Sequence, residues 1–368
     1  MRLDLFYDRT DEETANRLAV LDGRRYVVRA LVPEGYETYF QERARFISAH
    51  TSTAIEGNPM TEEAAMLVLV EGANPNDPDS IEKVNLKEVY ELTSELASDR
   101  TIKIDEGIIR TVNSMALKGL PDRQARTRGK YRVGQNLIVD AETGQVRYTP
   151  PSPERVPELM GGLISSIEQW MEEHPAPVAA ALTHFGLISI HPFDDGNGRT
   201  ARVIADMILD LKGWSIDGML STSGIILDRR AEYYGALRAS QGPDFGEKID
   251  ATAFVRFHID ALTRAAVMLE DRVVLFNKRR DRLVRQLDFL NPRQVTGLMF
   301  MLDVGPVSST AYARMTASSQ ATALTDLTEL VNKKAAERVG AGRNTRYRLH
   351  PDLAQIANEA GTPSAGSE

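Results

Sequence analysis

The chain has 368 residues, of which 42% are hydrophobic and 26% are charged, and its formal net charge is −8. This composition is typical of a globular protein with two or three domains, whose core needs neither disulfides nor metal ions. The absence of cysteine excludes a disulfide framework, a thiolate metal site and a cysteine nucleophile. The negative charge argues against nucleic-acid binding by the whole chain but leaves room for a local basic patch.

The sequence also indicates where the protein resides. Residues 1–8 alternate charged and apolar side chains and lack the apolar core of a signal peptide. No stretch approaches the ~20 apolar residues that a membrane span needs. We therefore expect a cytoplasmic protein with no membrane partner, and the lack of cysteine is compatible with a reducing compartment.

Helical periodicity dominates the chain up to residue 116. It predicts helices over residues 36–55, 61–70, 80–97 and 105–116. Gly57-Asn58-Pro59 ends the first helix, because glycine and asparagine favour a helix end and proline cannot continue one.

Residues 129–150 have a different pattern. Two short apolar runs flank the polar segment Asp140-Ala141-Glu142-Thr143-Gly144, which predicts a β-hairpin over about residues 137–148. Helical periodicity then returns over residues 156–173, 178–190 and 198–212.

The C-terminal part reads as a separate module. Residues 292–302 indicate a helix, residues 310–315 and 318–330 a helix-turn-helix pair, and residues 338–339 and 345–349 two strands around a wing. This order predicts a winged helix over residues 285–352, followed by a mobile tail over residues 353–368.

One short segment combines the side chains that chemistry on phosphate needs. The Gly196-Asn197-Gly198 run leaves backbone N–H groups free at the start of a helix, which makes an anion site suited to phosphate. Arg199 and Arg202 share a helical face and indicate more than one phosphate. Asp195 could hold Mg²⁺ together with phosphate oxygens, and His191 could take a proton from an attacking hydroxyl. The alternative is a plain helix–loop–helix connection with a structural histidine.

The segment from His191 to Arg202 resembles the signature of the Fic family, His-x-Phe-x-Asp/Glu-Gly-Asn-Gly-Arg-x-x-Arg. It matches every fixed position of that signature, namely His191, Phe193, Asp195, Gly196, Asn197, Gly198, Arg199 and Arg202. The resemblance implies a mainly helical fold and the transfer of AMP from ATP to a protein hydroxyl. We therefore expect a mainly α fold, a Fic-type helical core with a short β-hairpin flap, plus the winged helix.

The resemblance also implies a role for each matching residue. His191 would be the catalytic base, Phe193 would anchor the loop in the core, and Asp195 would hold Mg²⁺. Gly196, Asn197 and Gly198 would cradle the phosphates, with the Asn197 amide orienting the α-phosphate. Arg199 and Arg202 would bind the β- and γ-phosphates.

Gly198 bears on the type of reaction. The related Doc kinases place a lysine at the equivalent position and bind ATP in a reversed sense. Glycine at this position therefore favours transfer of AMP over transfer of the γ-phosphate.

A second segment, Ser52-Thr53-Ala54-Ile55-Glu56-Gly57-Asn58, resembles the inhibitory motif of the same family. Ser52 and Glu56 are four residues apart and share a helical face. The resemblance implies that Glu56 pairs with Arg202, occupies the γ-phosphate position and inhibits transfer. In some family members this glutamate aligns a water that removes AMP from the target, which makes AMP removal a second expected activity. A surface glutamate is the alternative.

Other parts of the core resemble the family as well, and the resemblance covers roughly residues 36–260. The hairpin at 137–148 matches the flap, which holds an extended segment of the target protein by strand pairing. Tyr234 and Gln241 lie two helical turns apart on a helix that resembles the one lining the adenine pocket. An aromatic ring and an amide suit adenine, although tyrosines on a helix also serve core packing.

These patterns divide the chain into four predicted parts. We expect an N-terminal helical region over residues 1–100, a Fic core over 101–265, the winged helix over 285–352 and the tail over 353–368. Family resemblance suggests a homodimer that controls Glu56. The sequence names neither the target protein nor which residue type, Tyr, Thr or Ser, is modified.

The C-terminal module leaves a rival function open. Residues 331–348 carry six basic residues, Lys333, Lys334, Arg338, Arg343, Arg346 and Arg348, against Glu337. Such a wing could contact DNA, yet the predicted recognition helix carries Asp326 and Glu329 and no cation, which argues against DNA. The rival function is a transcriptional regulator whose Fic core only senses nucleotide.

Overall fold

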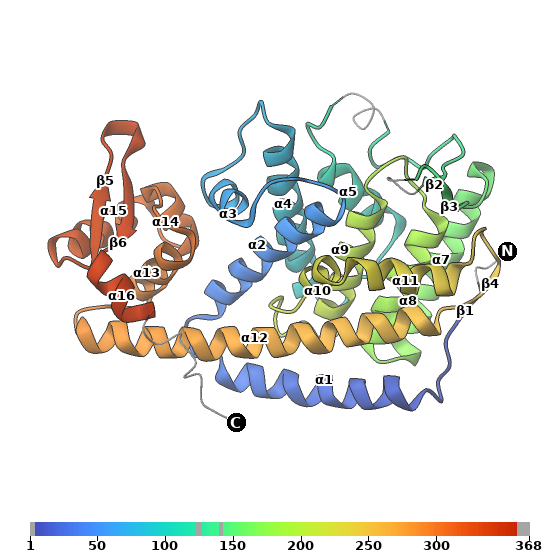
Figure 1. Cartoon of the computed structure of the whole chain (residues 1–368), viewed down its shortest axis with the longest axis horizontal. Helices are drawn as coiled ribbons and strands as arrows, with labels where there is room; N and C mark the ends of the chain where they lie inside the picture. Colours follow the sequence, from blue (N-terminus) through green and yellow to red (C-terminus); the bar gives the residue numbers. More distant parts are fainter. Residues whose placement is uncertain (1–3, 122–126, 140–142, 359–368) are drawn as a thin grey trace. The chain divides into compact units, whose positions relative to one another are not determined.

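The computed structural model describes residues 4–121, 127–139 and 143–358. The described chain is mostly helical and groups into two compact units (Figure 1). Unit 1 holds the residues up to Tyr26, Ala44–Met60 and Ala73–Val267. Unit 2 holds Val27–Arg43, Thr61–Gly72 and the residues from Met268 onward.

Unit 1 is built around helix α8 (Ala176–Ile190). All but one of its residues are buried, as expected for a helix that is apolar on every side. Its main neighbours are α7 (Val156–Glu173) and α9 (Asn197–Leu211). The far side of α9 is covered by α4 (Pro78–Ser98) and α5 (Glu106–Ala116). The two ends of α8 and α9 that face the joining loop are therefore held from several sides.

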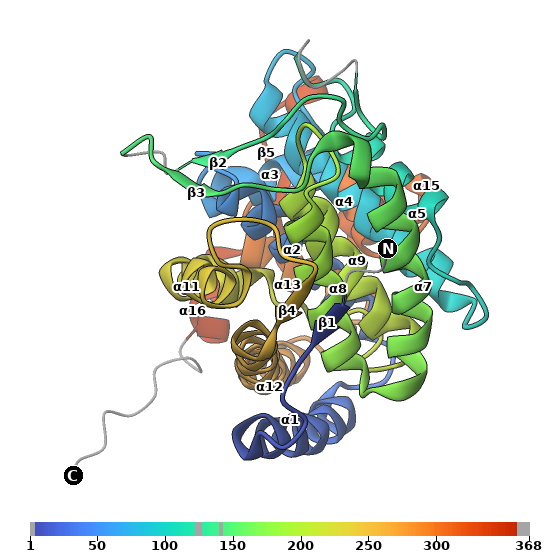
Figure 2. The same ribbon diagram turned by 90° about the vertical axis from the view of Figure 1, so that its right-hand side faces the viewer.

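The remaining elements of unit 1 surround this centre. They include η1 (Pro153–Arg155), α10 (Ser223–Asp228), α11 (Arg230–Gln241) and the parallel strands β1 (Asp4–Phe6) and β4 (Lys248–Asp250). Figure 2 shows β1 and β4 side by side. Leu5 and Ile249, which are paired in register, are the buried residues of these strands.

The predicted hairpin is present as β2 (Ile138–Val139) and β3 (Val146–Tyr148), which pair antiparallel (Figure 2). The register shifts between Ile138 and Val139. Asp140, Ala141 and Glu142 of the predicted turn lie outside the described residues. Tyr148 is buried and donates its hydroxyl to the Ser189 carbonyl at 2.8 Å, which ties the hairpin to α8.

Unit 2 contains α3 (Glu62–Glu71), α13 (Pro292–Val304), α14 (Ser309–Met315), α15 (Gln320–Asn332) and the antiparallel strands β5 (Ala336–Val339) and β6 (Arg346–Leu349). A 3₁₀ turn, η2 (Gly342–Asn344), joins the strands. This is the predicted order of elements, and the name winged helix stays a prediction. α15 begins later than expected because Ser319 caps it by accepting from the Thr322 N–H at 3.1 Å.

Three long helices, α1 (Glu12–Leu31), α2 (Glu37–Ile55) and α12 (Thr252–Gln286), contribute residues to both units. The units therefore differ from the predicted domain boundaries. Within unit 2, the ring of Tyr39 from α2 packs against Phe276 and Phe300, each at 4.7 Å between centroids. These long-range aromatic contacts, which no local pattern reveals, place residues 27–43 with the C-terminal part.

The predicted mobile tail needs a correction. Residues Pro351–Asn358 form helix α16, whose Leu353 and Ala357 are buried, so the first part of the expected tail is packed. Residues 359–368 lie outside the described part of the chain. None of the helices that the structure describes combines the length and apolarity that a membrane crossing needs.

Candidate nucleotide site

The loop predicted to carry chemistry joins the C-terminus of α8 to the N-terminus of α9. His191 caps α8 in the left-handed region with φ 50°, and Gly196 precedes α9 with φ 79°. A Cβ at Gly196 would lie 2.8 Å from the Asn113 side-chain nitrogen. This position therefore requires glycine both for its positive φ and for the close approach of Asn113. The same nitrogen of Asn113 donates to the Asp195 carbonyl at 2.9 Å and so holds the loop against α5.

Asn197 closes the loop on itself. Its side-chain oxygen accepts from the Phe193 N–H at 2.9 Å, and its side-chain nitrogen donates to the Phe193 carbonyl at 2.8 Å. The Phe193 ring is 1% exposed and lies in the core, as expected for an anchor. The structure thus assigns the Asn197 amide to the loop backbone, and its contact with an α-phosphate stays a prediction.

Asp195 has one oxygen engaged and one free. Its Oδ1 accepts from the Gly196 N–H at 2.6 Å and from Arg199 Nη2 at 2.9 Å. Its Oδ2 is buried and has no hydrogen-bond partner among the described residues. An orphaned carboxylate oxygen fits a divalent cation. No cluster of three or more acidic or histidine side chains that could hold a metal exists in the described part of the chain, so phosphate oxygens and water would have to complete the shell.

Arg199 is buried between two carboxylates. Its guanidinium pairs with Asp195 on one side and with Glu82 of α4 on the other, and its side chain is 4% exposed. Glu82 also accepts from the Asn58 side-chain nitrogen at 2.7 Å. Asn58 lies two residues after Glu56, so Glu82 links α9 to the end of α2.

Arg202 is the most deeply buried cation of the site, with a side chain that is 1% exposed. Its Nε donates to Ser52 Oγ at 2.8 Å, and its Nη2 donates to the Ser52 carbonyl at 2.9 Å and to Glu56 Oε1 at 2.7 Å. A Cβ at Gly198 would lie 2.1 Å from Glu56 Oε1. Only glycine at position 198 therefore admits the Glu56 carboxylate to the start of α9.

Charge explains the ionisation of Glu56. Desolvation alone would raise its pKa, but the guanidinium groups of Arg202 and Arg199 outweigh that effect and hold the pKa below its usual value. The Glu56 carboxylate is therefore ionised at neutral pH and occupies the place where an anionic ligand of Arg202 would bind.

His191 is held neutral by its surroundings. Desolvation lowers its pKa to about 4, the Arg132 charge acts in the same direction, and the Ile188 carbonyl, Glu56 and Asp195 oppose it. A neutral imidazole at pH 7 can accept a proton, which a general base requires.

The predicted adenine residues lie on α11 and are both partly buried. Gln241 donates to Ser189 Oγ at 3.0 Å, and Ser189 precedes His191 by two residues. Tyr234 contacts the Tyr233 ring at 5.1 Å and the Arg230 guanidinium at 5.7 Å. The structure therefore brings Ser52 and Glu56 together with Arg202 of the 191–202 segment, whereas for Gln241 and Tyr234 it describes no direct contact with that segment.

The sequence interpretation missed the residues that support the loop from other helices. Glu82 and Asn113 lie on α4 and α5, far from the signature in sequence, and no local pattern marks them. Asn58 is part of the segment that resembles the inhibitory motif, but its bond to Glu82 was not predicted.

Comparison with known proteins identifies the domain. The sequence model of the Fic/DOC family matches residues 103–209, which include α8, the loop and α9. The chain carries a Fic domain. Over nearly its whole length the chain resembles a Fic family protein from Desulfovibrio desulfuricans, with 25% identity, a TM-score of 0.58, and coverage of 94% of this chain and 98% of that one.

Curated relatives of the Fic domain extend the comparison. The chain is 28% identical over 223 residues to "Protein adenylyltransferase Fic" from Nematostella vectensis, which covers 56% of this chain and 45% of the relative. It is 32% identical over 122 residues to "Protein adenylyltransferase fic-1" from Caenorhabditis elegans. That match covers 31% of this chain and 21% of the relative. The chain thus spans less than half the length of these relatives.

The Glu56–Arg202 contact predicts a measurable effect on stability. Glu56→Ala leaves a buried guanidinium without its counter-charge, and because Glu56 is partly exposed we expect the free energy of unfolding to fall by only about 1–3 kcal/mol. Urea denaturation measures this loss, and added pyrophosphate should restore stability in the variant more than in the wild type. Glu88→Ala, which removes an exposed glutamate of α4, is the matched control. Equal stability of the two variants, with no response to pyrophosphate, would contradict the assigned contact.

Proposed function

We propose that this chain transfers AMP from ATP to a hydroxyl group of another protein and that Glu56 inhibits this transfer. The observation that carries the proposal is the arrangement at the start of α9, where two buried arginines and a glycine-flanked helix N-terminus lie beside a neutral histidine. The printed names of curated relatives, which are protein adenylyltransferases, support the same activity.

In the proposed reaction the phosphates of ATP bind at the N-terminus of α9, where free backbone N–H groups and the helix dipole favour anions. Arg199 and Arg202 neutralise the β- and γ-phosphates. His191 takes the proton of a Tyr, Thr or Ser hydroxyl while that oxygen attacks the α-phosphorus. The bond from the α-phosphorus to the bridging oxygen breaks, and pyrophosphate leaves.

Mg²⁺ is the proposed cofactor, and Asp195 is the residue that would hold it through its free Oδ2. The ion would neutralise charge on the phosphate oxygens. Gln241 would hydrogen-bond the adenine from α11, with Tyr234 on the same helix as the proposed stacking partner.

The inhibition follows from competition for one guanidinium. Glu56 is ionised and already hydrogen-bonds Arg202, so a γ-phosphate must displace it or bind elsewhere. Contacts between α2 and α4 favour the inhibited arrangement. The buried Lys83 donates to Thr53 Oγ1 at 2.6 Å and to the His50 carbonyl at 3.2 Å, and Asn58 is bonded to Glu82.

The hairpin formed by β2 and β3 is the proposed docking place for the target protein. Val139 and Val146 are paired in register, and both are about half exposed, which leaves an apolar cross-strand pair available to an extended partner.

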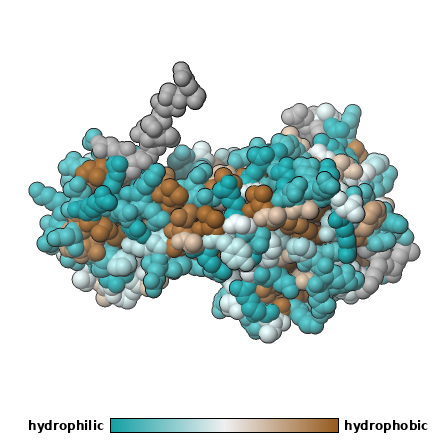
Figure 3. All heavy atoms as spheres, turned by 90° about the horizontal axis from the view of Figure 1, so that it is seen from below, coloured by the Kyte–Doolittle hydropathy of each residue, from teal (hydrophilic) through white to brown (hydrophobic). Residues whose placement is uncertain are grey.

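A homodimer is a further proposal. Val20 and Tyr26 of α1 are 50% and 61% exposed, and Figure 3, which views the side of α1 and α12, shows apolar atoms on that face. Burial of such apolar surface would favour self-association.

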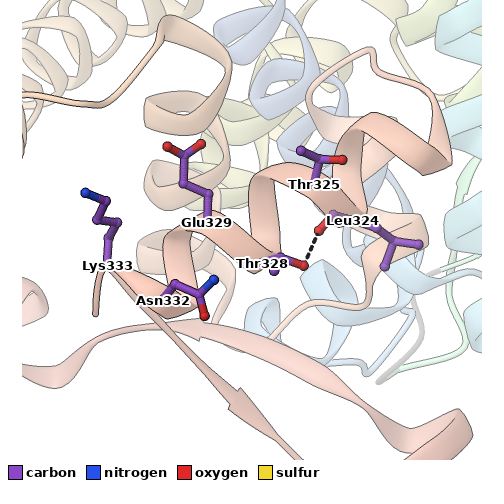
Figure 4. Close-up of a pocket in the computed structure, with 6 residues that line it drawn as sticks. All are labelled: Leu324, Thr325, Thr328, Glu329, Asn332 and Lys333. Carbon is purple, nitrogen blue, oxygen red and sulfur yellow. Dashed lines mark hydrogen bonds between the residues drawn. The ribbon is translucent and has the colours of Figure 1, made fainter.

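The rival function as a DNA-binding regulator has mixed support. Asp326 is buried and paired with Arg293, at 2.6 and 2.8 Å, so this acid does not face a ligand as the sequence suggested. The pocket along α15 contains one cation, Lys333, which follows the helix, and one acid, Glu329, so it offers little positive charge to a phosphate backbone (Figure 4). The pocket is lined by Leu324, Thr325, Thr328, Glu329, Asn332 and Lys333. Arg348 of the wing is paired with Glu337 at 2.7 Å. AMP transfer therefore remains the better-supported proposal.

Labelled ATP tests the reaction directly. We expect Glu56→Gly to transfer label from the α-phosphate of ATP to proteins of a cell extract at least tenfold faster than the wild type, because Arg202 becomes available to the γ-phosphate. His191→Ala in the same background should abolish transfer, by about 10²–10⁴-fold. Label from the γ-phosphate alone would indicate a kinase. No label from either position, together with tight binding of duplex DNA, would favour the regulator.

The pKa of His191 is accessible to NMR titration of labelled histidine, with His191→Ala to identify its signal. We expect a value of about 4 in the wild type. Glu56→Gln should lower it further, because the Glu56 carboxylate stabilises the imidazolium form and its removal favours the neutral ring. A value near 6.5 that does not change in Glu56→Gln would show that the imidazole lies in open solvent, against the proposed base.

Glu56 also supports a hypothesis about the reverse reaction, because a carboxylate beside the site could orient a water that removes AMP from a modified protein. We expect the wild type to release AMP from the modified target and Glu56→Gly to have lost this activity. The measurement is AMP released from protein that Glu56→Gly has labelled beforehand. Intact removal by Glu56→Gly would disprove the dual role.

A further inference from the structure

The chain just before the hairpin is hydrogen-bonded to the loop that carries His191. The Arg132 N–H donates to the Pro192 carbonyl at 2.9 Å, and Arg132 Nε donates to the His191 carbonyl at 2.8 Å. Arg132 Nη2 reaches the Ile190 carbonyl at 3.5 Å, and the Asn136 side-chain nitrogen donates to the Phe193 carbonyl at 3.1 Å. Four consecutive carbonyls, from Ile190 to Phe193, therefore accept from this one segment.

The Arg132 guanidinium has an unusual set of partners for a buried charge. The residue is 2% exposed, and its described hydrogen bonds all go to backbone carbonyls. Besides the loop, Nη1 donates to the Gly134 carbonyl at 3.1 Å, and Nη2 donates to the Pro151 carbonyl. Gly134 precedes β2 and Pro151 follows β3, so one side chain joins both stems of the hairpin to the His191 loop.

This arrangement meets two requirements of the loop. The last carbonyls of a helix lack partners within the helix, and Arg132 supplies donors for those of Ile190, the last residue of α8, and of its cap His191. His191 itself adopts φ 50°, which is uncommon for a residue other than glycine and persists only where the surroundings hold it. A fixed backbone in turn fixes the direction in which the imidazole points.

We infer that Arg132 is a positioning residue for the transfer reaction, because it holds the His191 backbone in its left-handed conformation and couples that loop to both stems of the hairpin. This inference rests on the proposed function for the role of His191. It adds a residue outside the signature, and it connects the proposed base to the proposed docking hairpin.

The Arg132 charge has a second consequence for His191. It favours the neutral imidazole, together with desolvation, whereas Glu56 and Asp195 favour the protonated form, and the pKa of His191 stands at about 4. Replacing Arg132 with a neutral residue should therefore raise the pKa of His191. Lysine would keep the charge but lose the fork of donors that reaches several carbonyls at once.

The test compares Arg132→Lys and Arg132→Met in the Glu56→Gly background, with Lys130→Met as the control at a nearby exposed cation. Initial rates of α-phosphate label transfer to extract proteins over a range of ATP concentrations give apparent kcat and KM. We expect kcat to fall by about 10²-fold in Arg132→Met, and by less in Arg132→Lys, while KM for ATP changes less than about threefold, because Arg132 does not contact the phosphate site. NMR titration should show a raised His191 pKa in Arg132→Met alone.

Several outcomes would overturn the inference. These are an unchanged kcat in Arg132→Met, a rise in KM that accounts for the whole loss, or a His191 pKa that moves equally in Arg132→Lys and Arg132→Met, as general loosening of the structure would produce. Failure of the Glu56→Gly parent to transfer label would instead contradict the proposed function. In that case the NMR titration still decides whether Arg132 controls the His191 loop.

Discussion

The proposed function depends on one electrostatic contact, the hydrogen-bonded ion pair between the Glu56 carboxylate and the buried Arg202 guanidinium. A buried guanidinium is costly without an anionic partner, so an anion at this place stabilises the site. In the structure that anion is the side chain of Glu56, in the turn that follows α2. During the proposed reaction it would be the γ-phosphate of ATP. In the proposed function, activity and inhibition therefore depend on which anion, the γ-phosphate or the Glu56 carboxylate, binds Arg202, and the free-energy difference between these two states would set the activity of the protein.

Glu56 and a γ-phosphate can compete for Arg202 because the backbone at the start of α9 lies close to its neighbours. Gly198 has no side chain, and a Cβ there would collide with the Glu56 carboxylate. Gly196 allows the loop to turn beside Asn113 before α9 begins. The buried helix α8 and its neighbours hold the two ends of the loop, while Arg132 and Asn136 bond its successive carbonyls. The start of α9, where we propose that phosphate binds, the proposed base and the turn that carries Glu56 are therefore parts of one packed arrangement.

Local pattern predicted the elements that are regular and locally signalled. The helices around residues 36–55, 156–173 and 198–212 follow apolar periodicity, and glycine and proline mark their ends. The Fic signature consists of residues close together in the sequence, so it could be found without a structure. The family comparison confirms a Fic domain over residues 103–209. The 35-residue helix α12, the strands β1 and β4 and the division into units were not predicted, because they depend on contacts between distant residues. Glu82, Asn113 and the role of Arg132 were not predicted for the same reason: each residue lies on another segment and acts through a contact across the fold.

The most direct test is a crystal structure of Glu56→Gly with a non-hydrolysable ATP analogue and Mg²⁺. We expect a γ-phosphate oxygen at the position of Glu56 Oε1 on Arg202, the metal ion beside Asp195 Oδ2, and the α-phosphorus facing His191. Phosphates bound away from the start of α9, with Arg202 still bonded only to Ser52, would contradict the proposed function.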